Sequence, residues 1–315
     1  MISIIGLIFT LNAVITWALA SLVYKAGLSK TNPKATILFR LIIVSLFTFI
    51  IAYFLGDFIA FFNFNLNKTY NYLFFCLISG ISVTIGDFCY FYSLRLIDAS
   101  RAYPLTQLSL VFVYPFAFLF FGEEITFSII FGGALILSSV FLLSSKDNDK
   151  KIEKINDNND IKKNISQEKL LEGVILAIGT ALFWAIAIVA FHQARIISGD
   201  VFLTNFFRVF FAMLFVFSIS FFKREYLSSF KQENRHLLKY YGFIGLAGAL
   251  SLGLADSLFY KAAELNGLVL TSTITANTPM VQQIFSVLIL REKFRKRFII
   301  AVCLIILGNY LILFI

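Results

Sequence analysis

The chain contains two related stretches, Ser-Val-Thr-Ile-Gly-Asp at residues 82–87 and Ser-Leu-Gly-Leu-Ala-Asp at residues 251–256. They lie 169 residues apart, and each places an aspartate inside a run of more than twenty mainly apolar residues. A helix needs about 20 apolar residues to cross the hydrocarbon core of a bilayer. The two stretches therefore predict a pair of membrane-spanning helices, each with a carboxylate in its interior.

The similarity between the two regions extends to rare residues on either side of these stretches. Offsets between 167 and 169 residues align three further pairs, which are Trp17 with Trp184, Arg40 with Arg208, and Glu123 with Glu292. The offset drifts by only two residues, as a small number of insertions in loops would produce. This nearly constant offset indicates that the chain contains an internal repeat, with two related halves.

The composition of the whole chain is that of a membrane protein. Of its 315 residues, 59% are hydrophobic and only 14% are charged, and the mean hydropathy is +0.85. A typical soluble domain is about 45–50% apolar and about 25% charged. A soluble enzyme, a nucleic-acid-binding protein and a disordered regulator are therefore poor fits.

The apolar runs predict an all-α membrane protein with ten membrane-spanning helices. The predicted helices are 2–24, 35–55, 71–94, 99–121, 125–144, 170–194, 201–222, 239–262, 268–290 and 297–315. Between the fifth and the sixth, a stretch rich in Lys, Asp and Asn has the composition of a solvated linker. We therefore expect a first five-helix repeat at 1–145, a polar linker at 146–169 and a second five-helix repeat at 170–315.

The positive charges predict how these helices cross the membrane. The net charge is +9, and the odd-numbered loops hold 22 Lys and Arg residues whereas the even-numbered loops hold 3. The positive-inside rule places the odd-numbered loops and the linker in the cytoplasm and both termini outside. Because each half has an odd number of helices, the second half must be inverted relative to the first. We expect a multi-pass protein of the cell (inner) membrane.

Several loose motifs follow one another in order along both halves. In the first half they are Trp17, Lys25, Phe39-Arg40, Tyr92-Ser93-Leu94, Ala99-Ser100-Arg101-Ala102, Pro115, Gly122-Glu123 and Gly132-Gly133. In the second half they are Trp184, Phe207-Arg208, Tyr260-Lys261-Ala262-Ala263, Pro279, Glu292 and Gly308, with Arg291 in place of the glycine expected before Glu292. With these motifs the chain resembles the EamA family of the drug/metabolite transporter (DMT) superfamily, over all but the linker. The resemblance implies a ten-helix bundle around a central cavity that exports or imports small metabolites.

Asp87 and Asp256 are the first candidates for functional residues. A carboxylate near the centre of a bilayer costs about 2.5–3.5 kcal/mol, so each is expected to face a cavity or a partner. One interpretation is that one or both take up a proton or bind a cationic group. The other is a structural ion pair or a hydrogen bond between helices, with Arg40, Arg208 or Lys261 as the partner.

Residues five positions from each aspartate add to this candidate site. Ser82 and Ser251 precede the aspartates and are interpreted as cavity lining or as links between helices. Tyr92 and Lys261 follow them on nearly the same helix face. A lysine close to Asp256 would neutralise that carboxylate, which favours the aspartate of the first half as a proton site.

The paired arginines and tryptophans have two interpretations each. Arg40 and Arg208 lie one to two turns inside their helices, where a long side chain can extend to the membrane interface. The functional alternative is an anion clamp for a carboxylate or phosphate. Trp17 and Trp184 lie near or beyond mid-span, where they either line the cavity or pack between helices.

The remaining pair, Glu123 and Glu292, lies at loop edges, where a carboxylate is expected to gate or to cap a helix rather than to bind cargo.

All these features predict a secondary active transporter. It would move small polar or amphipathic metabolites, such as amino acids, by alternating access, with proton coupling left open. The expected partners are a small-molecule metabolite and membrane lipid, with no nucleic acid, and the protein would be a monomer or a homodimer.

An intramembrane aspartyl protease that uses Asp87 and Asp256 is the alternative function. Its Tyr-Asp and Gly-x-Gly-Asp signatures are both incomplete here. Ala255 replaces the tyrosine before Asp256, and Thr84 replaces the first glycine of the motif that ends at Asp87. The chain also has no zinc-protease, serine-hydrolase or phosphate-loop motif. We therefore expect no enzymatic activity, no metal and no cofactor.

Overall fold

The computed structural model describes residues 2–97, 99–144, 160–290 and 297–314, and this part of the chain is almost entirely helical and contains no strand. In the first half the helices are α1 (Ile4–Leu28), α2 (Pro33–Leu55), α3 (Phe58–Phe62), α4 (Leu66–Leu96), α5 (Ala99–Thr106), α6 (Ser109–Phe121) and α7 (Phe127–Ser144). The second half begins with α8 (Asp160–Ser198), α9 (Val201–Phe222) and the two 3-10 segments η1 (Arg224–Phe230) and η2 (Gln232–Leu237). It continues with α10 (Leu238–Gly248), the π-helical segment η3 (Ala249–Ala255), α11 (Asp256–Asn266), α12 (Leu268–Thr275), α13 (Thr278–Leu290) and α14 (Arg297–Phe314).

The fold is that of an all-α membrane protein, as predicted. By length and composition, 7 helical segments of the described chain are long and apolar enough to cross a membrane, and two shorter apolar helices lie at 127–139 and 299–314. Helix is present in each of the ten predicted ranges. Large apolar side chains such as Phe54, Leu119 and Phe222 are exposed on the outer surface. A bilayer solvates such a surface, because the helices satisfy their own backbone hydrogen bonds.

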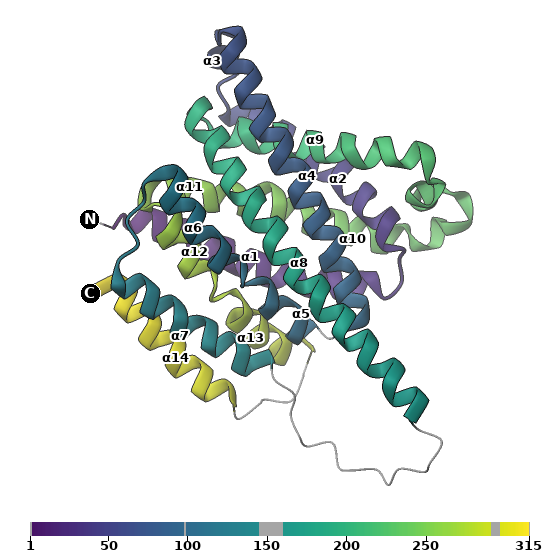
Figure 1. Ribbon diagram of the computed structural model, residues 1–315. Helices are drawn as coiled ribbons and strands as arrows, with labels where there is room; N and C mark the ends of the chain where they lie inside the picture. The colour runs from purple at the N-terminus through teal and green to yellow at the C-terminus, as the bar shows by residue number, and fades with distance from the viewer. Residues whose placement is uncertain (1, 98, 145–159, 291–296, 315) are drawn as a thin grey trace.

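The two halves interlock rather than form two separate bundles. Helix α4 of the first half packs mainly against α8 and α9 of the second, and Figure 1 shows α4 and α8 running side by side. In return, α10 and α11 of the second half pack against α1 of the first. Helices α7 and α14 pair at one edge of the bundle, and the two ends of the chain lie on the same side (Figure 1). Each aspartate-bearing helix therefore has its most extensive contact with a helix of the opposite half.

The predicted helices at 99–121 and 268–290 are both interrupted in the structure, whereas the sequence predicted continuous spans. The first is divided into α5 and α6, and the second into α12 and α13. In the second case Pro279 has no backbone N–H, so the carbonyl of Thr275 loses its helical donor. The hydroxyl of Thr278 donates to that carbonyl instead, at 2.5 Å. A local side-chain bond thus replaces the missing backbone bond and accommodates the break.

The start of the second half also differs from the expectation. Helix α8 begins at Asp160, so residues 160–169 of the predicted polar linker extend the sixth helix. A helix that is already nucleated gains one backbone hydrogen bond per added residue, and this favours extension even through polar sequence. Residues 145–159, which include most of the predicted linker, lie outside the described residues.

Candidate functional site

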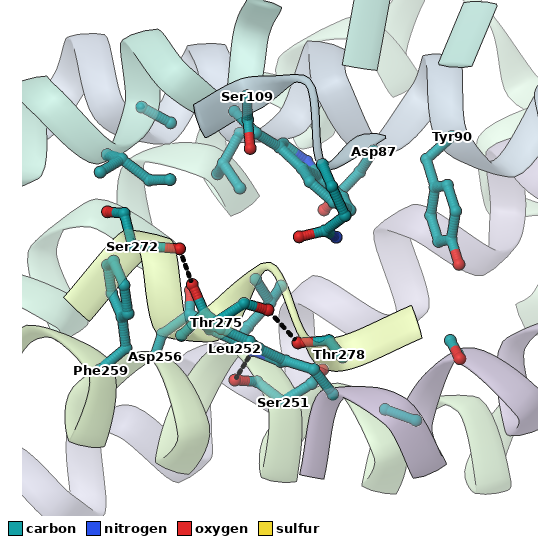
Figure 2. A pocket seen from close by; sticks show the side chains of 18 of the residues that line it. Asp87, Tyr90, Ser109, Ser251, Leu252, Asp256, Phe259, Ser272, Thr275 and Thr278 are labelled. Atoms are coloured by element: carbon teal, nitrogen blue, oxygen red, sulfur yellow. Dashed lines mark hydrogen bonds between the residues drawn. The ribbon is translucent and has the colours of Figure 1, made fainter. Parts of the chain in front are cut away.

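A cavity lies between the two halves. Seven of the predicted site residues line it, namely Trp17, Arg40, Asp87, Trp184, Arg208, Ser251 and Asp256. The interrupted helices add hydroxyl groups to the same cavity, from Ser109 in the first half and from Ser272, Thr275 and Thr278 in the second. Figure 2 shows Asp87 and Ser109 on one side of the open space and Ser272 and Thr275 on the other. The cavity is thus built by both repeats.

Each aspartate forms an ion pair with the arginine of its own half. The Arg40 Nη2 group donates to Asp87 Oδ2, and the Arg208 Nη2 group donates to Asp256 Oδ2 at 2.5 Å. The two arginines are only 2% and 1% exposed. The interpretation that they extend to the membrane interface is therefore wrong. A charge inside the bundle is better stabilised by an opposite charge at hydrogen-bonding distance than by a distant interface.

Two aromatic rings hold each guanidinium group in place. The Cζ atom of Arg40 lies 5.3 Å from the ring centroid of Tyr24 and 4.9 Å from that of Phe91. The Cζ atom of Arg208 lies 5.1 Å from the ring centroid of Phe191 and 5.7 Å from that of Tyr260. These distances are in the range of cation–π contacts, which position an arginine without neutralising it.

The four rings were not predicted as site residues, although the repeat register contains the signal for them. Tyr24 aligns with Phe191 at an offset of 167, and Phe91 aligns with Tyr260 at an offset of 169. The tyrosine and phenylalanine are therefore exchanged between the halves. Aligned aromatic residues are common in a chain with 17% aromatic content, so their contact with the arginines is visible only in the structure.

Each carboxylate also accepts a hydrogen bond from the tryptophan of the opposite half. The Trp184 Nε1 group donates to Asp87 Oδ1 at 3.2 Å, and the Trp17 Nε1 group donates to Asp256 Oδ1 at 2.9 Å. Because α4 packs on α8 and α11 packs on α1, these bonds cross between the repeats. The two tryptophans therefore link the ion pair of one half to the first helix of the other.

The two predicted serines have different positions relative to the cavity. Ser251 lines the cavity and its Oγ atom lies 2.6 Å from the hydroxyl of Tyr24, whereas Ser82 is buried and is not among the lining residues. Ser251 lies in η3, where the Asp256 N–H bonds to the Ser251 carbonyl. In such an i→i+5 segment, residues five apart lie one above the other. In the regular helix α4, five residues correspond to about 140° of rotation beyond a full turn.

Tyr92 and Lys261 do not face the cavity, contrary to the expectation that they share a face with the aspartates. The same five-residue rotation in a regular helix turns them away from Asp87 and Asp256. The Lys261 side chain is 37% exposed, and its Nζ atom lies 2.8 Å from Glu264 Oε2. Arg208 pairs with Asp256 instead, so the reason for favouring the first-half aspartate as a proton site does not hold.

The predicted gate-or-cap residue Glu123 contacts the start of α12. Its two carboxylate oxygens accept hydrogen bonds from the backbone N–H groups of Leu268 and Val269, each at 2.7 Å. A carboxylate at a helix N-terminus satisfies free N–H groups and interacts favourably with the helix dipole. Its predicted counterpart, Glu292, lies outside the described residues.

Comparison with known proteins decides the family. The model of the EamA-like transporter family matches residues 4–145 and again residues 171–314. The chain belongs to the EamA-like transporter family. The two matches also identify two EamA repeats in this EamA protein, and the predicted resemblance to the EamA family of the DMT superfamily is confirmed.

A curated relative and a solved structure are also similar to this chain. The EamA protein is 37% identical over 70 residues to an uncharacterized transporter in the cobO 3' region of Sinorhizobium sp., and the match covers 22% of this chain and 50% of that protein. The chain thus spans about half the length of this relative. A solved structure described only as the crystal structure of a protein shares the fold, with a TM-score of 0.67 and 15% identity. That match covers 97% of this chain and 95% of the other.

Proposed function

We propose that this EamA protein is a secondary active transporter that moves small polar or amphipathic metabolites, such as amino acids, across the membrane by alternating access. The observation that carries the proposal is the cavity, which is walled by helices of both repeats and contains both ion pairs. A cavity placed between two interlocked repeats opens to one side or the other when one repeat rocks against its partner. This arrangement supports transport rather than catalysis.

The chemistry of the cavity supports a cargo that carries both polar and apolar groups. Trp17, Trp184 and Phe259 supply apolar surface, and serine and threonine hydroxyls supply hydrogen-bonding groups. Its two arginines and two aspartates carry no net charge together. Transfer of a net charge into a site of low dielectric constant is costly, so such a cavity favours cargo that leaves the site neutral. A zwitterion such as an amino acid satisfies this condition.

The orientation in the membrane is part of the same proposal. We expect an inner-membrane protein with the odd-numbered loops and the 146–169 linker in the cytoplasm and with both termini outside, because of the strong bias in Lys and Arg. Two inverted five-helix repeats, at 1–145 and 170–315, would place both termini on the same side of the membrane. A reporter fused to the C-terminus that is active only outside the cytoplasm tests it. The monomeric or homodimeric state stays a prediction.

The alternative of an intramembrane aspartyl protease is not favoured by the geometry. Aspartyl proteases need two carboxylates that share one proton. In the described part of this chain, each aspartate instead bonds to an arginine and to an indole. We therefore propose transport alone.

Counterflow in proteoliposomes tests the proposed function. Vesicles that contain the purified protein are preloaded with an unlabelled amino-acid mixture, and the entry of labelled amino acids is followed over time. We expect saturable entry that is faster than in protein-free vesicles. Entry that does not exceed the protein-free rate with any amino acid or other small metabolite tested would contradict transport.

Two matched leucine variants connect this flux to the cavity. Leu252 lines the cavity, while Leu254 in the same helical segment is 37% exposed on the outside. Leu252→Trp should fill the cavity and abolish counterflow. Leu254→Trp adds the same side chain outside the cavity and should leave counterflow near the wild-type rate. Equal rates in the two variants would place the transport path elsewhere.

A further inference from the structure

Asp87 and Asp256 have equivalent ion pairs but different surroundings. The side chain of Asp256 is 10% exposed and that of Asp87 is 4% exposed. The indole N–H of Trp17 lies within hydrogen-bonding distance of two acceptors, Asp256 Oδ1 at 2.9 Å and the Ser251 carbonyl at 3.3 Å. Among the described residues, the Trp184 indole donates to Asp87 alone. Trp17 can therefore keep a hydrogen bond if Asp256 moves away, whereas Trp184 cannot.

Arg208 is held in place independently of Asp256. Its guanidinium group contacts the rings of Phe191 and Tyr260, which themselves stack with their centroids 3.5 Å apart. The Arg208 Nε atom is buried without a hydrogen-bond partner among the described residues. A guanidinium group that is fixed in this way stays in position when its carboxylate partner is exchanged. Apolar surface for the rest of a ligand lies beside it, where Trp17 and Phe259 pack with centroids 5.5 Å apart.

From this geometry we propose that Arg208 binds the carboxylate of the cargo, and that the displaced Asp256 takes up a proton when the cargo brings no cation of its own. The inference rests on the proposed function, because it assigns the cargo class and the coupling to the same cavity. A cargo carboxylate forms a new pair with Arg208, the Arg208–Asp256 pair breaks, and one proton from solution neutralises Asp256. The site then carries the same net charge as before, and Trp17 keeps its bond to the Ser251 carbonyl.

The charged and titratable groups around Asp256 agree with this exchange. Those that face it or lie close to it are Arg208 from α9, Tyr24 from α1, Arg40 from α2, Asp87 from α4, Tyr103 from α5 and Tyr260 from its own helix. Arg40 is already paired with Asp87, and the other neighbours are phenols, so a displaced Asp256 anion finds no free cation in this set. An unpaired buried carboxylate is strongly unfavourable and becomes neutral instead. If the cargo carries an ammonium group next to its carboxylate, Asp256 binds that group and needs no proton.

Proton uptake on ligand binding tests the proposal with two probes that differ by one group. Phenylpropionate has a carboxylate and an aromatic body, and phenylalanine adds an ammonium group. Each probe is mixed with the purified full-length protein in a weakly buffered solution near neutral pH that contains a pH indicator. We expect about one proton taken up per bound phenylpropionate and none per bound phenylalanine. Uptake that is equal for both probes, or absent with phenylpropionate, overturns the proposal.

Carboxylate variants assign the proton to its site. Asp256→Asn should bind phenylpropionate more tightly and take up no proton, because Arg208 is then unpaired. Glu264→Gln removes another carboxylate from α11, outside the cavity, and should leave uptake at about one proton. If Asp87→Asn abolishes the uptake and Asp256→Asn does not, the assignment to Asp256 is wrong.

The chain has only two tryptophans, so intrinsic fluorescence reports on each aspartate without a change in either carboxylate. Trp184→Phe leaves Trp17 beside Asp256, and Trp17→Phe leaves Trp184 beside Asp87. We expect phenylpropionate to change the emission of Trp17 and to leave that of Trp184 nearly constant, and the reverse result contradicts the proposal. Counterflow of phenylpropionate without proton uptake would support transport and contradict the role of Asp256. Proton uptake on phenylpropionate binding without any flux would support the role of Asp256 and contradict transport.

Discussion

Helix α4 and the segment α10–η3–α11 start from matching sequence and present different faces to the cavity. In α4, Ser82 and Asp87 belong to one regular helix, and only the aspartate lines the cavity. In the second half, the π-helical segment η3 brings Ser251 onto the same face as Asp256. Both repeats therefore keep the ion pair, while a local change of helical pitch in one of them alters the groups around it. The Tyr24–Ser251 contact has no counterpart in the other pair of equivalent residues, because Phe191 has no hydroxyl to contact Ser82.

The largest expected effect comes from breaking one ion pair in each half. Asp87→Asn leaves Arg40 buried and unpaired and should lower the free energy of unfolding by about 3–5 kcal/mol. Asp256→Asn should cost less, because its side chain is the more exposed of the two. Unfolding of the purified protein in detergent measures both values. The double variant Arg40→Met with Asp87→Leu should recover most of the loss, and an equally unstable double variant would contradict this explanation.

Removing the tryptophans tests the bonds that cross between the halves. Trp184→Phe removes a hydrogen bond to Asp87, the less exposed of the two carboxylates, and should lower the free energy of unfolding by about 1.5–3 kcal/mol. Trp17→Phe should cost less, since Asp256 is more open to the cavity. The same unfolding measurement compares the two. A larger loss of unfolding free energy for Trp17→Phe would contradict the interpretation that Asp87 is the less solvated carboxylate.

The residue before each aspartate also differs between the halves. A Cβ atom at Gly86 would lie 2.5 Å from Trp184 Cδ1 and 2.8 Å from its Nε1, whereas the equivalent residue in the second half is already Ala255. Gly86→Ala should therefore displace the indole and cost about 1–3 kcal/mol. Ala255→Gly should cost only about 0.5–1 kcal/mol, from helix propensity. Equal thermal midpoints for the two variants would show that the indole adjusts freely.

The smallest expected effect removes the contact that distinguishes the halves. Tyr24→Phe gives the first half the same side chain that Phe191 provides in the second, and it leaves Ser251 without its phenol partner. The loss of one neutral hydrogen bond should lower the free energy of unfolding by about 0.5–1.5 kcal/mol. Adding Ser251→Ala should bring little further loss, because both variants remove the same bond. Fully additive losses would argue against a coupled pair.

Much of the candidate site was predictable from rare residues in register. The offsets that align Arg40 with Arg208 and Trp17 with Trp184 identified four residues that line the cavity together with both aspartates. The contact partners of these residues were harder to predict from the sequence. Arg208, rather than Lys261, pairs with Asp256, because a lysine five positions along a regular helix points to another face. The exchange of tryptophans between the halves depends on how the repeats interlock, which no local pattern encodes.

The amino-acid sequence alone establishes the lengths of the apolar runs, the register of the repeat and the membership of the EamA family. These properties follow from hydropathy and spacing along the chain, which need no knowledge of distant contacts. The tertiary structure is needed to show which arginine, indole and hydroxyl contacts each carboxylate. Those contacts join residues up to 239 positions apart, as Trp17 and Asp256 are, and they depend on the packing of α4 against α8 and of α11 against α1. The pitch of η3 was also decided there, because a π-helical turn is stable only where the packing around it stabilises the extra residue.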